Sequence, residues 1–186
     1  MDTMRRGEIA GILCLIAVVA SFVAAFVFGV GKSAMGDVVS LVIYVIVCVT
    51  YLALLLAVQE IVKSVGDVVF VHRMRVFLFV VVATYLLFAP LTTPFFVPDW
   101  LEAILVFVAI VLTAIFGVVS IRVAPFFDKL EGRRAEYGRK AARWLKISGW
   151  LMATVILSVF GAIASLVADF YMWRLVRSER LNANSK

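Results

Sequence analysis

The sequence predicts an all-α fold, a polytopic transmembrane bundle of about five spanning helices with one basic amphipathic helix at the membrane interface. Hydrophobic residues make up 65% of the 186 residues, well above the roughly 45–50% of an ordinary globular domain. They gather in long apolar runs that short charged breaks separate, as expected of helices that cross a hydrocarbon core of about 30 Å. At this length we expect one domain, residues 1–186.

Five apolar runs are long enough to span a bilayer. They cover residues 8–30, 38–58, 75–93, 101–121 and 147–171. Each should be an α-helix, because backbone groups in lipid must find their hydrogen bonds within the segment. The first run follows a basic start but is too long for the apolar region of a signal peptide, so we expect it to remain as a helix.

Local signals mark two helix ends. The spacing of Asp99 and Glu102 is that of a capping box with Asp99 as N-cap, and Trp100 is typical of an interface, so the fourth helix should start near Trp100. Three prolines between residues 90 and 98 favour extended chain, and they predict that the third helix ends near Ala89.

Residues 122–146 form the longest polar stretch, with a net charge of +5 from eight basic and three acidic residues. Apolar residues recur near helical spacing, so the segment predicts a basic amphipathic helix that lies among lipid headgroups on the cytoplasmic side. A plain topological anchor with a solvated face is the alternative. The candidate residues for lipid or partner binding are Arg133, Arg134, Arg139, Lys140, Arg143 and Trp144.

The distribution of Lys and Arg predicts a multi-pass protein of the cell membrane with a cytoplasmic N-terminus. Thirteen basic residues then face the cytoplasm and five face outside, as the positive-inside rule requires. Five spans place the basic C-terminal tail outside, which conflicts with that rule. A re-entrant run would return the tail to the cytoplasm.

Small residues recur at spacings that let membrane helices approach closely. The pattern is typical of packing within a bundle, and an interface with a second copy or a partner protein is the alternative. The residues are Ala17, Ser21, Ala25 and Gly29 in the first run, Ala109, Thr113 and Gly117 in the fourth, and Gly149, Ala153, Gly161 and Ser165 in the fifth.

Residues able to carry chemistry are scarce in the apolar runs. Asp169, near the end of the fifth run, is the nearest to a candidate site, and we expect it to pair with Trp173 or Arg174 at the interface. His72 is the single histidine, whereas a catalytic metal site usually needs three protein ligands. We therefore expect no catalytic residues, no metal and no cofactor.

Two stretches carry a resemblance. One is the apolar helix that runs into an acid-bearing amphipathic turn, residues 54–67, and the other runs from Phe126-Phe127-Asp128-Lys129-Leu130 through Trp144 and Gly149 to Phe170-Tyr171. Both are similar to an uncharacterised family of small archaeal multi-span integral membrane proteins, known only as a domain of unknown function. The resemblance implies a compact helical membrane protein from an archaeon, and it implies no activity and no functional residues.

These observations favour a non-enzymatic integral membrane protein, a scaffold or accessory subunit of a larger membrane complex. The alternative is a small-solute or lipid transporter or channel, with Asp169 and the Tyr44–Tyr51 face of the second helix as its polar elements. The expected partners are the lipid bilayer with its anionic headgroups, and a membrane protein or a second copy of the chain. Nucleic acid is not expected, because the basic residues lie in the breaks between apolar runs.

Overall fold

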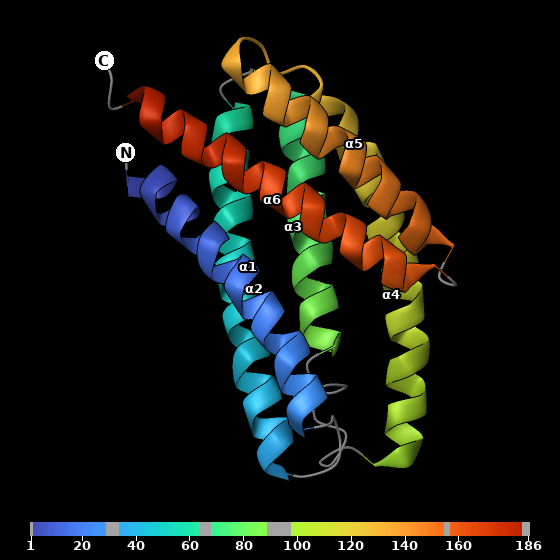
Figure 1. The fold of residues 1–186 in the computed structure, drawn as a ribbon. Helices are drawn as coiled ribbons and strands as arrows, with labels where there is room; N and C mark the ends of the chain where they lie inside the picture. The colour runs from blue at the N-terminus through green and yellow to red at the C-terminus, as the bar shows by residue number, and fades with distance from the viewer. Residues whose placement is uncertain (1, 29–33, 64–67, 89–97, 155–156, 184–186) are drawn as a thin grey trace.

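The computed structural model describes residues 2–28, 34–63, 68–88, 98–154 and 157–183, and within them the chain is all-α, as predicted. These residues form six helices (Figure 1). They are α1 (Asp2–Phe28), α2 (Ala34–Lys63), α3 (Val68–Phe88), α4 (Asp99–Phe127), α5 (Arg133–Ala153) and α6 (Ser158–Ala183).

Among the described residues, three helical segments are long and apolar enough to cross a membrane: Met35–Lys63, Val68–Leu86 and Ala103–Phe127. Their outer faces remain apolar, since Phe79 is 73% exposed and Phe107 is 67% exposed. An apolar surface of this extent is unfavourable in water and suits a lipid environment. The prediction of long apolar helices is confirmed for these three.

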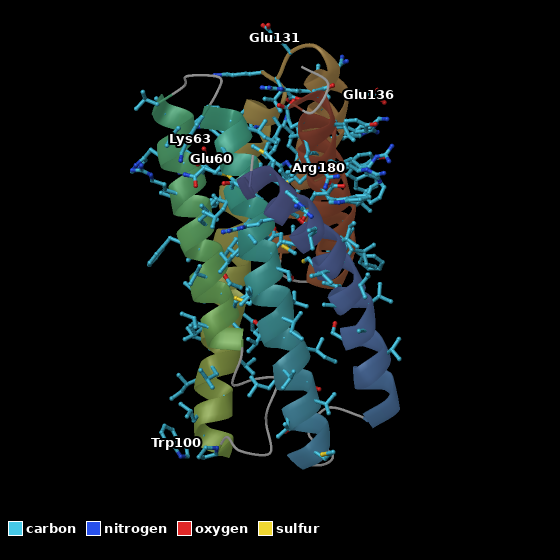
Figure 2. All side chains as sticks on the ribbon, turned by 90° about the vertical axis from the view of Figure 1, so that its left-hand side faces the viewer. Glu60, Lys63, Trp100, Glu131, Glu136 and Arg180 are labelled. Atoms are coloured by element: carbon cyan, nitrogen blue, oxygen red, sulfur yellow. The ribbon has the colours of Figure 1, made fainter. Side chains whose placement is uncertain are left out.

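The helices form a bundle with an oblique pair on one side. Figure 1 shows α2, α3 and α4 along the long axis, with α5 and α6 as an antiparallel pair that crosses them at an angle. In this arrangement α5 packs against α4, and α6 packs against α5, α1 and α2. Charged side chains gather at one end, where Figure 2 shows Lys63, Glu131 and Arg180, while Trp100 lies at the other end.

The prediction of one continuous helix over residues 147–171 is wrong. Helix α5 ends at Ala153, with Thr154 as its C-cap, and α6 begins at Ser158. The Thr154 hydroxyl donates a hydrogen bond to the Leu151 carbonyl oxygen over 2.8 Å. Helix α6 runs antiparallel to α5, so it ends beside the start of α1 (Figure 1), and its last turns lie at the same end of the bundle as the first turns of α1, not opposite them.

The prediction of a single amphipathic helix over residues 122–146 is also wrong. Its first six residues complete α4, and α5 starts only at Arg133. Between them Gly132 has φ +63°, a left-handed conformation that favours glycine and ends helical continuity. Nor is Asp99 an N-cap: Asp99 is already helical, and Pro98 with extended backbone precedes it without a side-chain capping hydrogen bond.

Two glycines set the distance between α4 and α5. A Cβ on Gly117 would lie 2.6 Å from the Gly149 carbonyl oxygen and 2.6 Å from the Ala153 nitrogen, and a Cβ on Gly149 would lie 2.6 Å from the Gly117 oxygen. The two backbones are therefore in direct contact. Gly161 plays the same part between α5 and α6, where a Cβ would meet Met152. These small residues pack within the chain.

Helix α1 makes its close contacts at glycines earlier in the chain than the expected ones. A Cβ on Gly7 would overlap Ala57 of α2, and a Cβ on Gly11 would lie 2.7 Å from Trp173 of α6. Ala17 and Ser21 are half-buried, and the Ser21 hydroxyl bonds to its own helix at Val18. The Ala25 side chain and Gly29 lie outside the described residues.

Candidate functional site

The basic residues expected to bind lipid or a partner fall into two groups along α5. Arg134 forms a two-pronged ion pair with Glu179 of α6. Arg139, Lys140 and Arg143 are exposed. Trp144 is half-buried against the core, and the side chain of Arg133 is outside the described set. The structure thus separates Arg134, which is ion-paired inside the chain, from an exposed basic row that consists of Arg139, Lys140 and Arg143.

Two residues of the exposed basic row, Arg139 and Lys140, form hydrogen bonds with neighbours on α5. The Lys140 ammonium donates to Glu136 over 2.7 Å, and Arg139 Nε donates to the Ala135 carbonyl oxygen over 3.2 Å. This hydrogen bond from Lys140 lowers the pKa of the Glu136 carboxyl and raises that of Lys140. Both groups are on the surface, so these shifts describe a solvated pair.

A second charged contact ties the two ends of the chain together. Glu8 in α1 lies 2.8 Å from a guanidinium nitrogen of Arg180 and 3.7 Å from Nε of Arg177, both in α6. The Glu8 carboxylate is buried, and it faces two cations. Its burial is therefore compensated within the described part of the chain.

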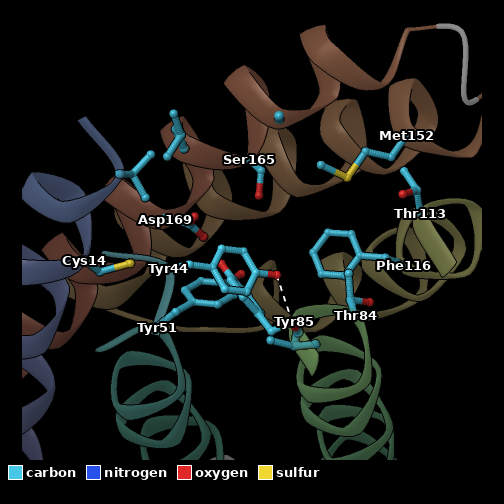
Figure 3. A pocket seen from close by; sticks show the side chains of 14 residues that line it. Cys14, Tyr44, Tyr51, Thr84, Tyr85, Thr113, Phe116, Met152, Ser165 and Asp169 are labelled. Carbon is cyan, nitrogen blue, oxygen red and sulfur yellow. Dashed lines mark hydrogen bonds between the residues drawn. The ribbon is translucent and has the colours of Figure 1, made fainter. Parts of the chain in front are cut away.

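All six helices meet at a cavity of about 440 Å³, within the range of about 300–1,000 Å³ for small-molecule sites. Figure 3 shows its lining from close by. The lining residues are Cys14, Val18, Tyr44, Tyr51, Val81, Thr84, Tyr85, Thr113, Phe116, Met152, Ala162, Ser165, Leu166 and Asp169.

Three tyrosines from α2 and α3 form one wall of the cavity. The rings of Tyr44 and Tyr85 are 5.3 Å apart between centroids, and those of Tyr51 and Tyr85 are 6.0 Å apart. The Tyr44 hydroxyl donates a hydrogen bond of 3.0 Å to the Tyr85 carbonyl oxygen and so satisfies a backbone acceptor near the end of α3. The cluster therefore presents aromatic rings, with the Tyr51 hydroxyl beside Asp169.

Asp169 of α6 supplies the only carboxylate among the lining residues that the structure describes. It is 7% exposed, Tyr51 is 4% exposed, and the two side chains interact with one another; among the described residues, neither Asp169 Oδ1 nor the Tyr51 oxygen makes a hydrogen bond of normal geometry. Figure 3 shows Asp169 and Ser165 directed from α6 toward the tyrosines. Burying a carboxylate without a compensating cation costs folding free energy. Such a residue is therefore better explained by a role in a binding site than by a contribution to stability.

The expectation that Asp169 pairs with Trp173 or Arg174 is wrong. Trp173 Nε1 has no hydrogen-bond partner among the described residues. Arg174 instead donates to the Tyr137 hydroxyl over 3.3 Å and lies over that ring. No described cation forms an ion pair with Asp169.

Several cavity residues were visible in the sequence, but not as one site. Tyr44, Tyr51 and Asp169 stood out as polar groups in apolar runs, and Thr113 and Ser165 as small residues. Tyr85 was visible only as a hydroxyl able to bond across helices, and Phe116 was missed, because their meeting with Asp169 depends on the oblique path of α6. Sequence periodicity describes one helix at a time, so it does not show which residues of different helices come together.

The described residues contain no group of three His, Cys, Asp or Glu placed to hold a metal ion. What the cavity offers is one carboxylate, several hydroxyls and an aromatic wall, which suits reversible binding. The likeness to an archaeal family stays a prediction, because comparison of the chain with protein-family models, curated proteins and solved structures finds no match.

Proposed function

We propose that the chain is a non-enzymatic, multi-pass protein of the cell membrane that binds a small solute in the cavity between its helices, as a transporter or a receptor does. One observation carries the proposal: Asp169 and Tyr51 are both more than nine-tenths buried and face one another at a cavity of about 440 Å³, and Asp169 Oδ1 has no hydrogen-bond partner of normal geometry among the described residues. Buried polar groups are normally paired, and the exceptions gather at functional sites.

The topology that accompanies this proposal has four spans, α1 to α4, with the N-terminus in the cytoplasm. Helix α1 has 27 residues, about 40 Å at 1.5 Å per residue, which exceeds the hydrocarbon core. Chain ends that lie together require an even number of crossings (Figure 1). This arrangement brings Arg174, Arg177 and Arg180 to the side that already holds most of the basic residues, which removes the conflict with the positive-inside rule.

In this topology α5 and α6 form a hairpin that enters from the cytoplasmic side and turns within the membrane. The side chains around the turn support it: Trp150, Leu157 and Phe160 are all exposed and apolar. Such a tip suits hydrocarbon, and re-entrant segments are tolerated where neighbouring protein buries most of their backbone.

Cysteine labelling tests the topology in a background without Cys14 and Cys48. Leu181→Cys and Arg139→Cys should react with an impermeant maleimide only after lysis, because both positions then face the cytoplasm. Trp100→Cys, at the opposite end of the bundle, should react in intact cells (Figure 2). Reaction of Leu181→Cys in intact cells would restore the five-span arrangement.

A scaffold or accessory subunit is the second candidate function. The exposed basic row of Arg139, Lys140 and Arg143 favours it, because such a row can meet anionic headgroups or an acidic partner. The small residues of α4, α5 and α6 no longer support a partner interface, since Gly117, Gly149 and Gly161 are used in contacts inside the chain.

Ligand-dependent thermal stability tests the binding function. Purified full-length protein in mild detergent is screened against neutral, anionic and cationic small molecules, because a ligand that binds only the folded state raises Tm. We expect at least one class to raise Tm, and Ser165→Leu, which fills the cavity, to abolish the shift. The matched control is Val49→Leu on the outer face of α2. If Ser165→Leu and wild type respond alike to every compound, the cavity is not the binding site.

A further inference from the structure

We infer that the cavity is built for an organic cation, a protonated amine with an apolar body, whose ammonium group lies between Asp169 and the tyrosine wall. This inference rests on the proposed binding function and names the ligand class for the same site. It follows from three properties of the lining: its charge, its aromatic surface and its shortage of metal-binding oxygens.

The charge of the lining favours a cation. Asp169 is the one ionisable carboxyl among the fourteen described lining residues, and none of these is Lys, Arg or His. An anionic solute would meet a carboxylate with no counter-charge beside it. Electrostatic interactions are strong where water is excluded, so this imbalance discriminates between charge types more than it would at a surface.

The aromatic wall favours a cation as well. Tyr44, Tyr51 and Tyr85 line the cavity beside Asp169 (Figure 3), and the neighbouring ring centroids are 5.3 Å (Tyr44 and Tyr85) and 6.0 Å (Tyr51 and Tyr85) apart. An ammonium group within about 6 Å of a ring centroid is attracted by the electron-rich face, most strongly where it is desolvated. Carboxylate and rings thus act on the same positive charge.

Unpartnered oxygens point to an ammonium group that carries N–H donors. Asp169 and the Tyr51 hydroxyl lie close enough to interact, but neither Asp169 Oδ1 nor the Tyr51 oxygen makes a hydrogen bond of normal geometry with a described residue, so each can still accept one. A protonated primary amine supplies up to three donors and satisfies both acceptors at once. A quaternary ammonium satisfies neither, so it should bind more weakly.

A bare metal ion fits the lining poorly. Hard cations take six or more oxygen ligands and favour several carboxylates, whereas the lining that the structure describes offers one carboxylate and a few neutral hydroxyls. Much of the remaining wall is apolar, including Val18, Val81 and Leu166. In the proposed complex this apolar wall contacts the apolar body of the ligand, and the carboxylate binds its charged end.

Calorimetric titration of the full-length protein in detergent tests the inference with three matched probes: 2-phenylethylammonium, neutral 2-phenylethanol and anionic 3-phenylpropionate. We expect the cation to bind about tenfold or more tightly than the alcohol, since a hydrogen bond to a charged group contributes that much when desolvated. Asp169→Asn should remove the preference and leave the alcohol unaffected. Tyr51→Phe should weaken the cation alone by a smaller factor.

The control variant is Glu60→Gln, which removes an exposed carboxyl that pairs with Lys63 outside the cavity. It should bind all three probes as wild type does. Each variant is checked for an unchanged melting profile before titration, and Tyr51→Phe gives an independent reading should Asp169→Asn fold poorly.

The outcomes separate the ligand class from the binding function. If the alcohol or the carboxylate binds as tightly as the amine and Ser165→Leu abolishes that binding, the cavity binds solutes but the cation inference is wrong. If the amine preference survives in both Asp169→Asn and Tyr51→Phe, the inference is wrong as well. If none of the probes binds the folded protein, both the inference and the proposed function lose their support.

Discussion

Glu8 and Asp169 are buried to nearly the same extent, 8% and 7% exposed, but their surroundings differ. Glu8 lies at the charged end of the bundle, where Arg177 and Arg180 reach it from α6. Asp169 lies among aromatic and apolar side chains, and no described cation forms an ion pair with it. Burial alone therefore does not distinguish a structural carboxylate from a functional one; the presence of a compensating cation does.

The same contrast extends to the regions around the two residues. At the charged end, Arg134 pairs with Glu179 and Glu8 with Arg180, so ion pairs join α5 to α6 and α6 to α1. At the cavity, the helices meet through tyrosines and small residues, and no described cation pairs with the Asp169 carboxylate. One region holds the ends of the chain together, and the other offers a binding site.

The largest expected effect tests whether the hairpin is held by backbone contact or by these ion pairs. Gly117→Leu places a side chain where the Gly149 oxygen and the Ala153 nitrogen already lie within 2.6 Å of a Cβ. We expect a loss of more than about 3 kcal/mol, because neither backbone can yield without moving α5. Denaturation monitored by circular dichroism measures it. The control is Val118→Leu, one residue on and facing outward, which should be neutral.

Run length and composition were sufficient to predict the all-α class and the apolar helices, because the bilayer imposes both. The hairpin was not predictable in this way. Residues 147–171 contain no proline, and nothing local at Thr154 differs from a spanning helix. Whether such a run crosses or turns back depends on what it packs against, here α4 through Gly149.

The misassigned contacts of α1 have a related cause. Gly7 and Gly11 stand at the four-residue spacing that indicates close packing, but only Gly11 lies inside the apolar run 8–30, and Gly7 falls among the charged residues before it. Their role becomes visible only because α1 begins at Asp2 and α6 crosses it there. The cavity could not be predicted for the same reason. Its residues were visible in the sequence, but the crossing angle of α6, which brings them together, was not.

The next prediction removes the charge at the compensated carboxylate. Glu8→Gln keeps the shape of the side chain but leaves Arg180 and Arg177 without their counter-charge. We expect a loss of about 1 kcal/mol, a figure lowered by the partial exposure of both arginines. Thermal unfolding in detergent measures it, and 1 M salt should shrink the difference. A variant as stable as wild type at low salt would show that the ends are held by packing alone.

The matching change at the uncompensated carboxylate should have the opposite sign or no effect. Asp169→Asn removes a buried charge that has no described cation partner, so the free energy of unfolding should stay within about 1 kcal/mol of wild type or rise. The same thermal assay, without added ligand, makes the comparison with Glu8→Gln direct. A larger loss from Asp169→Asn than from Glu8→Gln would make Asp169 a structural residue and reverse the distinction drawn between the two.

The smallest effect belongs to the exposed pair on α5. The Lys140 hydrogen bond lowers the pKa of Glu136, so any stabilisation is present above the unfolded pKa of this carboxyl and is lost as the pH falls through its folded pKa. Because both side chains are solvated, Glu136→Gln should leave Tm unchanged at neutral and at acidic pH alike. A drop in Tm at pH 7 that disappears under acidic conditions would contradict this. It would show that the basic row is part of the ion-paired end and is not a surface free to meet anionic headgroups.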